Sequence, residues 1–343
     1  MQISNDNKEE YKKFCERHYV QIYSKPWWLD AVCGSGNWDV WLYKKGDEVQ
    51  AAMPYYKEKR GKYNYITKAP LTQINGIIFA YPNNGILKRY AKQEFEERII
   101  DAANEFIQGL GIDVYEQQYS YNFSYWLPFF WHGYSAITRV TYVISDTSDI
   151  DKLWNDISYK YRKNIKKGQR NGEFGIGLTK KEFYTEHEKV FKKQGLECPF
   201  SYNFWCSLFD ACNKHNSCKI IYEKNAEGKI TSLLFIVWDE ESMYPLLGGS
   251  VPEFQRLETY NALTWEALKL ANSMGKKYDF EGSVIKRISK SFREFGGEPK
   301  RYYRIRKIFN EDIIRMEYEQ EVEKLKQENI KYELTKITRK NIL

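Results

Sequence analysis

The stretch Tyr244-Pro245-Leu246-Leu247-Gly248-Gly249-Ser250-Val251 decides the fold of the second half of the chain. It predicts a buried strand, and Pro252 to Leu257 form a loop that leads into a helix ending at Met274-Gly275. Another strand is predicted in Tyr278-Asp279-Phe280-Glu281-Gly282-Ser283. The first turn of the helix offers free backbone N–H groups and a positive dipole end, both of which suit a pyrophosphate or a carboxylate.

This first helical turn is the predicted binding site for a phosphate-bearing donor. The residues expected to contact the donor come from the strand end, the loop and the helix start: Gly249, Ser250, Gln255, Arg256 and Tyr260. The alternative is a capped helix that binds nothing.

Further helices and strands surround this unit. The pattern upstream predicts helices over 151–169, 183–193 and 202–214 and strands over 175–179, 219–223 and 230–239. Downstream, a basic helix and a strand precede a charged helix that starts near Glu311.

The first half of the chain repeats this plan. Its pattern predicts helices over 8–18, 26–32 and 87–108 and strands over 39–44, 49–56 and 112–118. Ala103 to Tyr115 resembles Ala267 to Asp279, since each reads as helix, glycine stop and strand. The chain has 343 residues, more than the roughly 250 to 300 of a single core. We therefore expect a duplicated α/β unit, with domains at 1–148 and 149–309 and a charged C-terminal helix at 310–343.

Several motifs in this order resemble one protein family. In the second half they are Arg162-Lys163-Asn164-Ile165-Lys166-Lys167-Gly168, Leu247-Gly248-Gly249, Tyr278 to Ser283, and Phe292-Arg293-Glu294-Phe295-Gly296-Gly297. In the first half they are Pro26-Trp27-Trp28-Leu29-Asp30 and Pro70-Leu71-Thr72-Gln73-Ile74-Asn75-Gly76. Together they resemble the Fem-type peptidyltransferases and the related Fem-like branch of the GNAT acyltransferase superfamily. The resemblance implies an α/β (α+β) fold of tandem GNAT-like domains, each a mixed, mostly antiparallel sheet flanked by helices.

The same resemblance implies two alternative donors of the transferred group, and the residues do not distinguish between them. Classical GNAT enzymes bind acyl-CoA, such as acetyl-CoA, through a glycine-rich loop, whereas Pro252 to Glu258 contains no glycine. Several Fem-type enzymes use aminoacyl-tRNA and carry a helical hairpin arm, which the sequence does not reveal. tRNA is thus a possible partner, and DNA is not expected.

Two carboxylates are candidates for the catalytic base that an amine nucleophile requires. Glu281 is the first candidate and Asp279 the second, because residues two apart in a strand share a face. The alternative is that Glu281 pairs with Arg287 or Arg293.

Basic and aromatic residues are candidates for substrate binding. Arg162 and Lys166 lie one helical turn apart and could clamp a phosphate, as could Arg293, unless they form a solvated face. A sugar pocket is predicted from the first half, although such aromatic residues are also typical of a core: Trp28, Tyr55, Tyr56, Gln73 and Asn75.

Composition sets the broad class. The formal net charge is +7, with basic clusters over 160–170 and 286–307 that would attract phosphates. The start of the chain is polar and acidic, and the longest apolar run, Leu233 to Trp238, is too short to span a membrane. A cytoplasmic protein is expected. Cys206, Cys212, His215 and Cys218 lack the spacing of a zinc site, and this chemistry requires no metal.

Three functions remain open at this point. The first is transfer of an acyl group from acyl-CoA to an amine of a nucleotide-sugar or cell-surface polysaccharide precursor, in bacterial cell-envelope biogenesis. The second is an aminoacyl-tRNA-dependent peptidoglycan cross-bridge enzyme, and the third is a non-catalytic carbohydrate- or nucleotide-binding protein. A heptad-like spacing within 314–336, with Tyr318, Val322 and Leu325, also predicts a possible homodimer.

Overall fold

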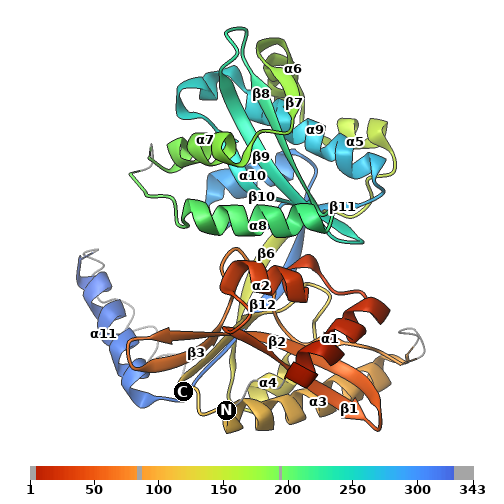
Figure 1. Cartoon of the computed structure of the whole chain (residues 1–343), viewed down its shortest axis with the longest axis vertical. Helices are drawn as coiled ribbons and strands as arrows, with labels where there is room; N and C mark the ends of the chain where they lie inside the picture. Colours follow the sequence, from red (N-terminus) through yellow and green to blue (C-terminus); the bar gives the residue numbers. More distant parts are fainter. Residues whose placement is uncertain (1–4, 83–86, 193–194, 328–343) are drawn as a thin grey trace, which may run out of the picture.

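Two lobes share one continuous sheet in the computed structural model, which describes residues 5–82, 87–192 and 195–327 (Figure 1). The sheet has 12 strands in the order β1-β2-β3-β5-β12-β6-β11-β10-β9-β8-β7, with β4 paired to β2. Helices cover both faces within each lobe. This mixed α/β arrangement confirms the expected fold class.

The first lobe contains the elements from α1 to β5 together with α4. It opens with a helix and two short helical turns that carry aromatic residues, and a hairpin follows. The elements are α1 (Asn5–Arg17), η1 (Ile22–Ser24), α2 (Pro26–Cys33), β1 (Trp38–Lys45), β2 (Glu48–Arg60), β3 (Tyr63–Thr67), β4 (Ile78–Phe79), α3 (Arg89–Gly109), β5 (Val114–Gln118) and α4 (Leu127–Trp131).

The second lobe contains the strand, loop, helix and strand predicted over residues 244–283. Helices α7 and α8 pack on one face of its strands, and α6 and α9 pack on the other. The elements are α5 (Ile150–Asp156), α6 (Tyr159–Asn171), β7 (Glu173–Ile176), α7 (Lys180–Lys192), α8 (Tyr202–Lys214), β8 (Cys218–Lys224), β9 (Ile230–Trp238), β10 (Ser242–Ser250), η3 (Pro252–Leu257), α9 (Thr259–Ser273), β11 (Lys277–Asp279) and α10 (Lys286–Glu294).

Two long strands cross between the lobes. They are β6 (Ser135–Ile144) and β12 (Glu298–Ile308), which pair antiparallel along their whole length. The far end of β12 pairs with β5 of the first lobe, while β6 pairs with β11 of the second. The expected boundaries at 148 and 309 stay a prediction, since the chain enters the second lobe along β6 and returns along β12 (Figure 1).

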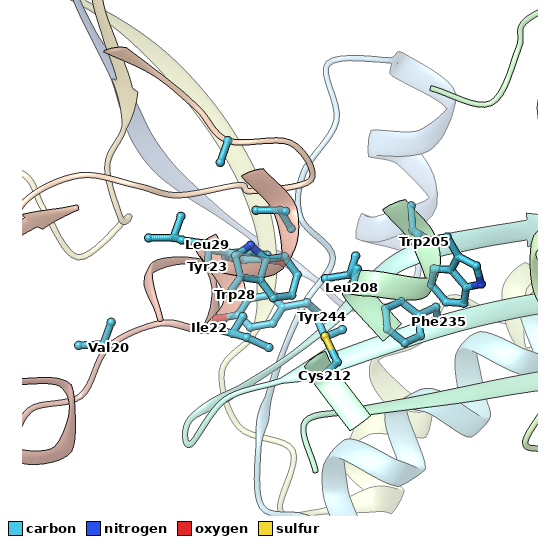
Figure 2. Close-up of a cluster of buried hydrophobic side chains, with 14 of the residues drawn as sticks. Val20, Ile22, Tyr23, Trp28, Leu29, Trp205, Leu208, Cys212, Phe235 and Tyr244 are labelled. Atoms are coloured by element: carbon cyan, nitrogen blue, oxygen red, sulfur yellow. The ribbon is translucent and has the colours of Figure 1, made fainter. Parts of the chain in front are cut away.

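An apolar cluster joins the lobes. Trp28 and Leu29 of α2 are buried in the same cluster as Leu208 and Cys212 of α8 and Tyr244 of β10. Figure 2 shows the side chains of the two lobes facing each other across this contact. The packing fixes the position of one lobe relative to the other.

Two predicted helices differ from the observed ones. The helix expected over 151–169 is broken into α5 and α6, because Ile157 is extended and Ser158 caps α6 by accepting a hydrogen bond from the Tyr161 N–H. The helix expected from Leu257 begins at Thr259, after the 3₁₀ turn η3 and a left-handed Glu258.

The C-terminal helix α11 (Glu311–Gln327) packs its first turns on its own chain. Ile313 is buried, and Arg306 of β12 forms an ion pair with Glu317. Tyr318 is 70% exposed, as a residue of a dimer seam would be before pairing. The dimer stays a prediction, and residues 328–336 of the proposed seam lie outside the described residues.

Candidate active site between the lobes

Glu281 lies in the loop after β11, where the two lobes meet. The strand ends at Asp279, so Glu281 is not a strand residue as expected but adopts a left-handed conformation with φ of 62°. Gly282 follows with φ of 63°, and a Cβ atom there would lie 2.1 Å from the Val140 carbonyl oxygen of β6. The loop is therefore pressed against a crossing strand, and only glycine fits at 282.

Residues from both lobes hold Glu281. The Tyr23 hydroxyl of η1 donates to its carboxylate, and the Gln73 amide donates to its carbonyl oxygen at 2.8 Å. Asp279 accepts the Glu281 N–H at 2.9 Å and also the Thr141 hydroxyl. Because these partners come from distant segments, the carboxylate takes its place only once the lobes have assembled.

The surroundings change the proton affinity of both carboxylates. Desolvation raises the pKa of Glu281 to about 8, the Tyr23 hydrogen bond and the Lys68 charge lower it, and the Asp279 charge raises it. Burial likewise raises the pKa of Asp279 to about 6, against the lowering effect of its hydrogen bonds from Thr141 and the Glu281 N–H. Glu281 can therefore exchange a proton near neutral pH, as a general base must.

A cavity of the first lobe shares one lining residue with the small space around this carboxylate. Glu281 and Asp279 line a small space with Tyr23, Gln73, Ile74, Thr141, Tyr244 and Tyr302. Ile74 also lines a larger cavity of about 230 Å³ in the first lobe. The wall of that larger cavity combines aromatic and polar side chains, among them Tyr19, Phe79, Tyr81, Lys92, Ser120 and Asn122.

Two arginines lie on the crossing strands beside this site. Arg139 of β6 is opposite Tyr302 of β12, and Arg304 is two residues further along β12, so the three share one face of the sheet. The Nε atoms of both arginines are buried without a hydrogen-bond partner among the described residues, although a terminal nitrogen of Arg304 forms an ion pair with Glu116 at 3.6 Å. Such guanidinium groups are suited to an anionic substrate group.

The predicted donor residues lie in the segment that leads into α9. Gly249 and Ser250 end β10, Gln255 and Arg256 lie exposed in η3, and Tyr260 is in the first turn of α9. Helix α6 packs closely here, because a Cβ atom on Gly168 would lie 2.5 Å from the Glu258 carbonyl oxygen. The structure thus brings basic helix α6 next to the predicted donor site.

The expected phosphate clamp of Arg162 and Lys166 needs correction. One guanidinium nitrogen of Arg162 donates to the carbonyl oxygens of Trp154, Asn155 and Ile157, which satisfies the C-terminal end of α5. Lys166 lies 5.8 Å above the Trp154 ring. Arg162 is thus engaged within its own chain, whereas the exposed basic residues of the helix are Lys160, Lys163, Lys166, Lys167 and Arg170. Arg293 is exposed on α10.

The expected sugar pocket also changes. Trp28 is fully buried and donates to the Thr72 hydroxyl, and Tyr55 is buried in the first-lobe core, so both are core residues rather than pocket walls. Tyr56 packs against the interlobe cluster. Of the predicted set, Gln73 reaches Glu281, and Asn75 is fully buried with an unpartnered amide among the described residues.

Sequence reasoning missed several residues that the structure places in the surroundings of Glu281 and Asp279. Tyr23, Thr141 and Arg139 are remote from Glu281 in the chain, and no local motif marks them. The only signal was the alternation of basic residues in Lys300 to Arg306, which placed Arg304 in a basic strand without indicating its neighbours.

The comparisons with known proteins agree with this fold. Residues 156–283 match the model of the acetyltransferase (GNAT) domain family. The structure is similar to the crystal structure of FemX, with a TM-score of 0.66 and 13% identity over 92% of this chain and 98% of that chain. No curated protein sequence matches the chain significantly.

Two further solved structures share the fold at lower similarity. The C-terminal domain of a putative lysylphosphatidylglycerol synthetase from Agrobacterium fabrum aligns with a TM-score of 0.53 and 11% identity over 89% of this chain and 92% of that chain. L-PGS from Bacillus licheniformis aligns with a TM-score of 0.50 and 11% identity over 88% and 91%. Within the described residues, no helix has the length and apolar character needed to span a membrane, and no group of three or more side chains is arranged to hold a metal ion. Residues 156–283 therefore form a GNAT acetyltransferase domain, set in a chain whose two-lobed fold matches that of FemX, as the resemblance to the Fem-like branch of the GNAT superfamily implied.

Proposed function

We propose that this protein is an N-acyltransferase in which Glu281 removes the proton from an acceptor amine. The observation that carries the proposal is the position of Glu281, which both lobes hold at the junction between a first-lobe cavity and the GNAT domain. The family match of the second lobe supports an acyl group as the transferred unit.

The reaction requires one proton transfer and one leaving group. The ionised Glu281 carboxylate accepts a proton from the neutral acceptor amine as its nitrogen attacks the acyl carbonyl carbon. The tetrahedral intermediate collapses as the bond from the carbonyl carbon to the donor breaks, the leaving group takes up the proton that Glu281 accepted, and the product is an amide. Because desolvation raises the pKa of Glu281 to about 8, the base form increases as the pH rises towards 8.

The acceptor we propose is the amine of a nucleotide-sugar or cell-surface polysaccharide precursor. The cavity beside Ile74 offers aromatic and hydroxyl groups that suit a sugar, together with Lys92. Arg139 faces the same site from the crossing strands and would bind a phosphate of such a precursor, with Arg304, which is ion-paired with Glu116, as a second positive charge beside it.

The donor we propose is acyl-CoA at the start of α9. The N-terminal end of that helix and the basic residues of α6 next to it would bind the phosphates of the donor. Aminoacyl-tRNA is the second candidate, and the row of exposed basic residues on α6 favours it, because a long nucleic-acid backbone engages many such charges.

Thermal-shift measurements with purified full-length protein test the donor. Acetyl-CoA is expected to raise the melting temperature, and Lys167→Ala with Arg170→Ala should reduce that shift in a salt-dependent way. A shift with tRNA that RNase abolishes, without a response to acetyl-CoA, would favour the aminoacyl-tRNA function. Ligand binding without any turnover on amine acceptors would instead indicate a binding protein.

A further inference from the structure

An uncharged aromatic segment leads from the cavity wall to the surface of the first lobe. Residues 117–138 contain no Lys, Arg, Asp or Glu, in a chain in which 29% of residues are charged. The segment contains Ser120, Asn122 and Phe123 of the cavity wall and then forms α4. We propose that α4 is a docking surface for a lipid bilayer, where it inserts into the interfacial region.

One face of α4 is apolar and open to solvent. Leu127, Phe130 and Trp131 occupy positions i, i+3 and i+4 and therefore share a face of the helix. Their exposed fractions are 42%, 57% and 57%, whereas Pro128 and Phe129 on the other face are buried. Helix α4 packs beside α3, in the end of the first lobe remote from the second lobe (Figure 1). The exposed face is thus free of the interlobe contact.

The size of this face favours a membrane over a protein partner. Large apolar side chains of this kind have about 150–250 Å² each, so three half-exposed ones present roughly 300 Å². A stable protein interface needs about 800 Å² from each partner. Insertion of a few aromatic and aliphatic side chains is in contrast sufficient for reversible binding to a bilayer, and Trp and Tyr concentrate at the membrane–water interface.

The charges around α4 indicate which membrane property matters. His132 at the end of the helix is paired with Asp101, and the Tyr125 hydroxyl donates to Glu97, both on α3. Lys307 of β12, which donates to the His132 carbonyl oxygen at 2.6 Å, is the basic group beside these two acidic residues, so the local charges of the described residues form no basic patch that would attract anionic lipids. Binding is therefore expected to depend on apolar insertion, to occur on phosphatidylcholine alone, and to change little with salt.

The test is co-sedimentation of the full-length protein with large unilamellar phosphatidylcholine vesicles. Phe130→Ser with Trp131→Ser is expected to lower the partition coefficient at least about tenfold. A matched control is Phe174→Ser with Ile176→Ser, which removes two similarly exposed apolar residues from β7 in the second lobe. The control should bind vesicles as the unchanged protein does.

Fluorescence adds a readout at α4 itself. Brominated phosphatidylcholine should quench Trp131, and Trp131→Phe should retain vesicle binding while it loses that part of the quenching. Equal vesicle binding by the Phe130 and Trp131 double variant would overturn the proposal. So would binding that requires anionic lipid and disappears with salt, or a dimer in sedimentation equilibrium that the double variant abolishes, since a second copy would then cover α4.

Discussion

Two carboxylates of the second half, Glu281 and Glu223, both have raised pKa values, yet their surroundings differ. Glu281 has hydrogen-bond partners from both lobes and lines the space beside a cavity. Glu223 lies in β8 at 2% exposure, and its Oε2 atom has no hydrogen-bond partner among the described residues. Burial and, to a smaller extent, the Glu266 charge raise the pKa of Glu223 to about 7, against the lowering effect of Lys269.

The surroundings of Glu223 explain its different role. A Cβ atom on Gly172 would lie 2.6 Å from Glu223 Oε2 and 3.0 Å from the Thr259 methyl group, so this carboxylate is packed below the start of α9. Glu223 lines neither of the two cavities described above. A raised pKa therefore does not by itself identify a catalytic base, and the difference between the two sites lies in access and in oriented partners.

The largest expected effect separates the two carboxylates by activity. Glu281→Gln should lower kcat by about 10²- to 10⁴-fold while the protein stays folded, because the amide cannot accept the proton. Glu223→Gln is the matched control and should leave kcat within about twofold of the unchanged protein. Steady-state kinetics with circular dichroism checks both, and equal losses in the two variants would contradict the assignment of the base.

The hydrogen bond from Tyr23 should set the pH at which Glu281 acts. This bond favours the ionised carboxylate, so Tyr23→Phe is expected to raise the pKa of Glu281 further. The ascending limb of the kcat–pH profile should then move to higher pH, with a roughly threefold to tenfold lower rate at pH 7. A profile that does not move would mean that Glu281 is not the titrating group.

Asp279→Asn should move the same profile in the opposite direction by a smaller amount. The Asp279 charge raises the pKa of Glu281, and the substituted amide would lack that charge while its oxygen could still accept the Glu281 N–H. The ascending limb should therefore move to lower pH, and the rate at pH 7 should rise a few-fold. Because burial raises the pKa of Asp279 to about 6, the two proteins should converge below pH 6.

The smallest effect concerns stability at Glu223. A folded-state pKa of about 7, above the ordinary 4.5, means that the folded protein is penalised progressively as the pH rises from 4.5 to 7. Glu223→Gln removes this penalty, so it should stabilise the protein by on the order of 1–3 kcal/mol above pH 7 and not at pH 4.5. Thermal melts at both pH values test this, and a gain that is independent of pH would contradict it.

Local patterns were sufficient for most elements of the fold. The stretch from Tyr244 to Ser283 has apolar strands around a helix, and the observed β10, α9 and β11 lie within a few residues of their predicted positions. Glycine stops and turn residues marked the ends of these elements, because the conformations they allow are local properties. The break between α5 and α6 was missed, since the extended Ile157 depends on how the two helices pack.

The residue Glu281 could be selected from the sequence by itself, since it is a carboxylate in the last predicted strand of the GNAT-like half. Its conformation, its hydrogen bonds with Tyr23 and Gln73, and the bond from Thr141 to the neighbouring Asp279 were decided only by the tertiary structure. The same holds for Arg162, whose charge suggested a phosphate site but whose guanidinium satisfies α5. The physical reason is that periodicity and turn chemistry act over a few residues, whereas burial, proton affinity and hydrogen-bond partners arise from segments far apart in the chain that meet only when β6 and β12 join the lobes.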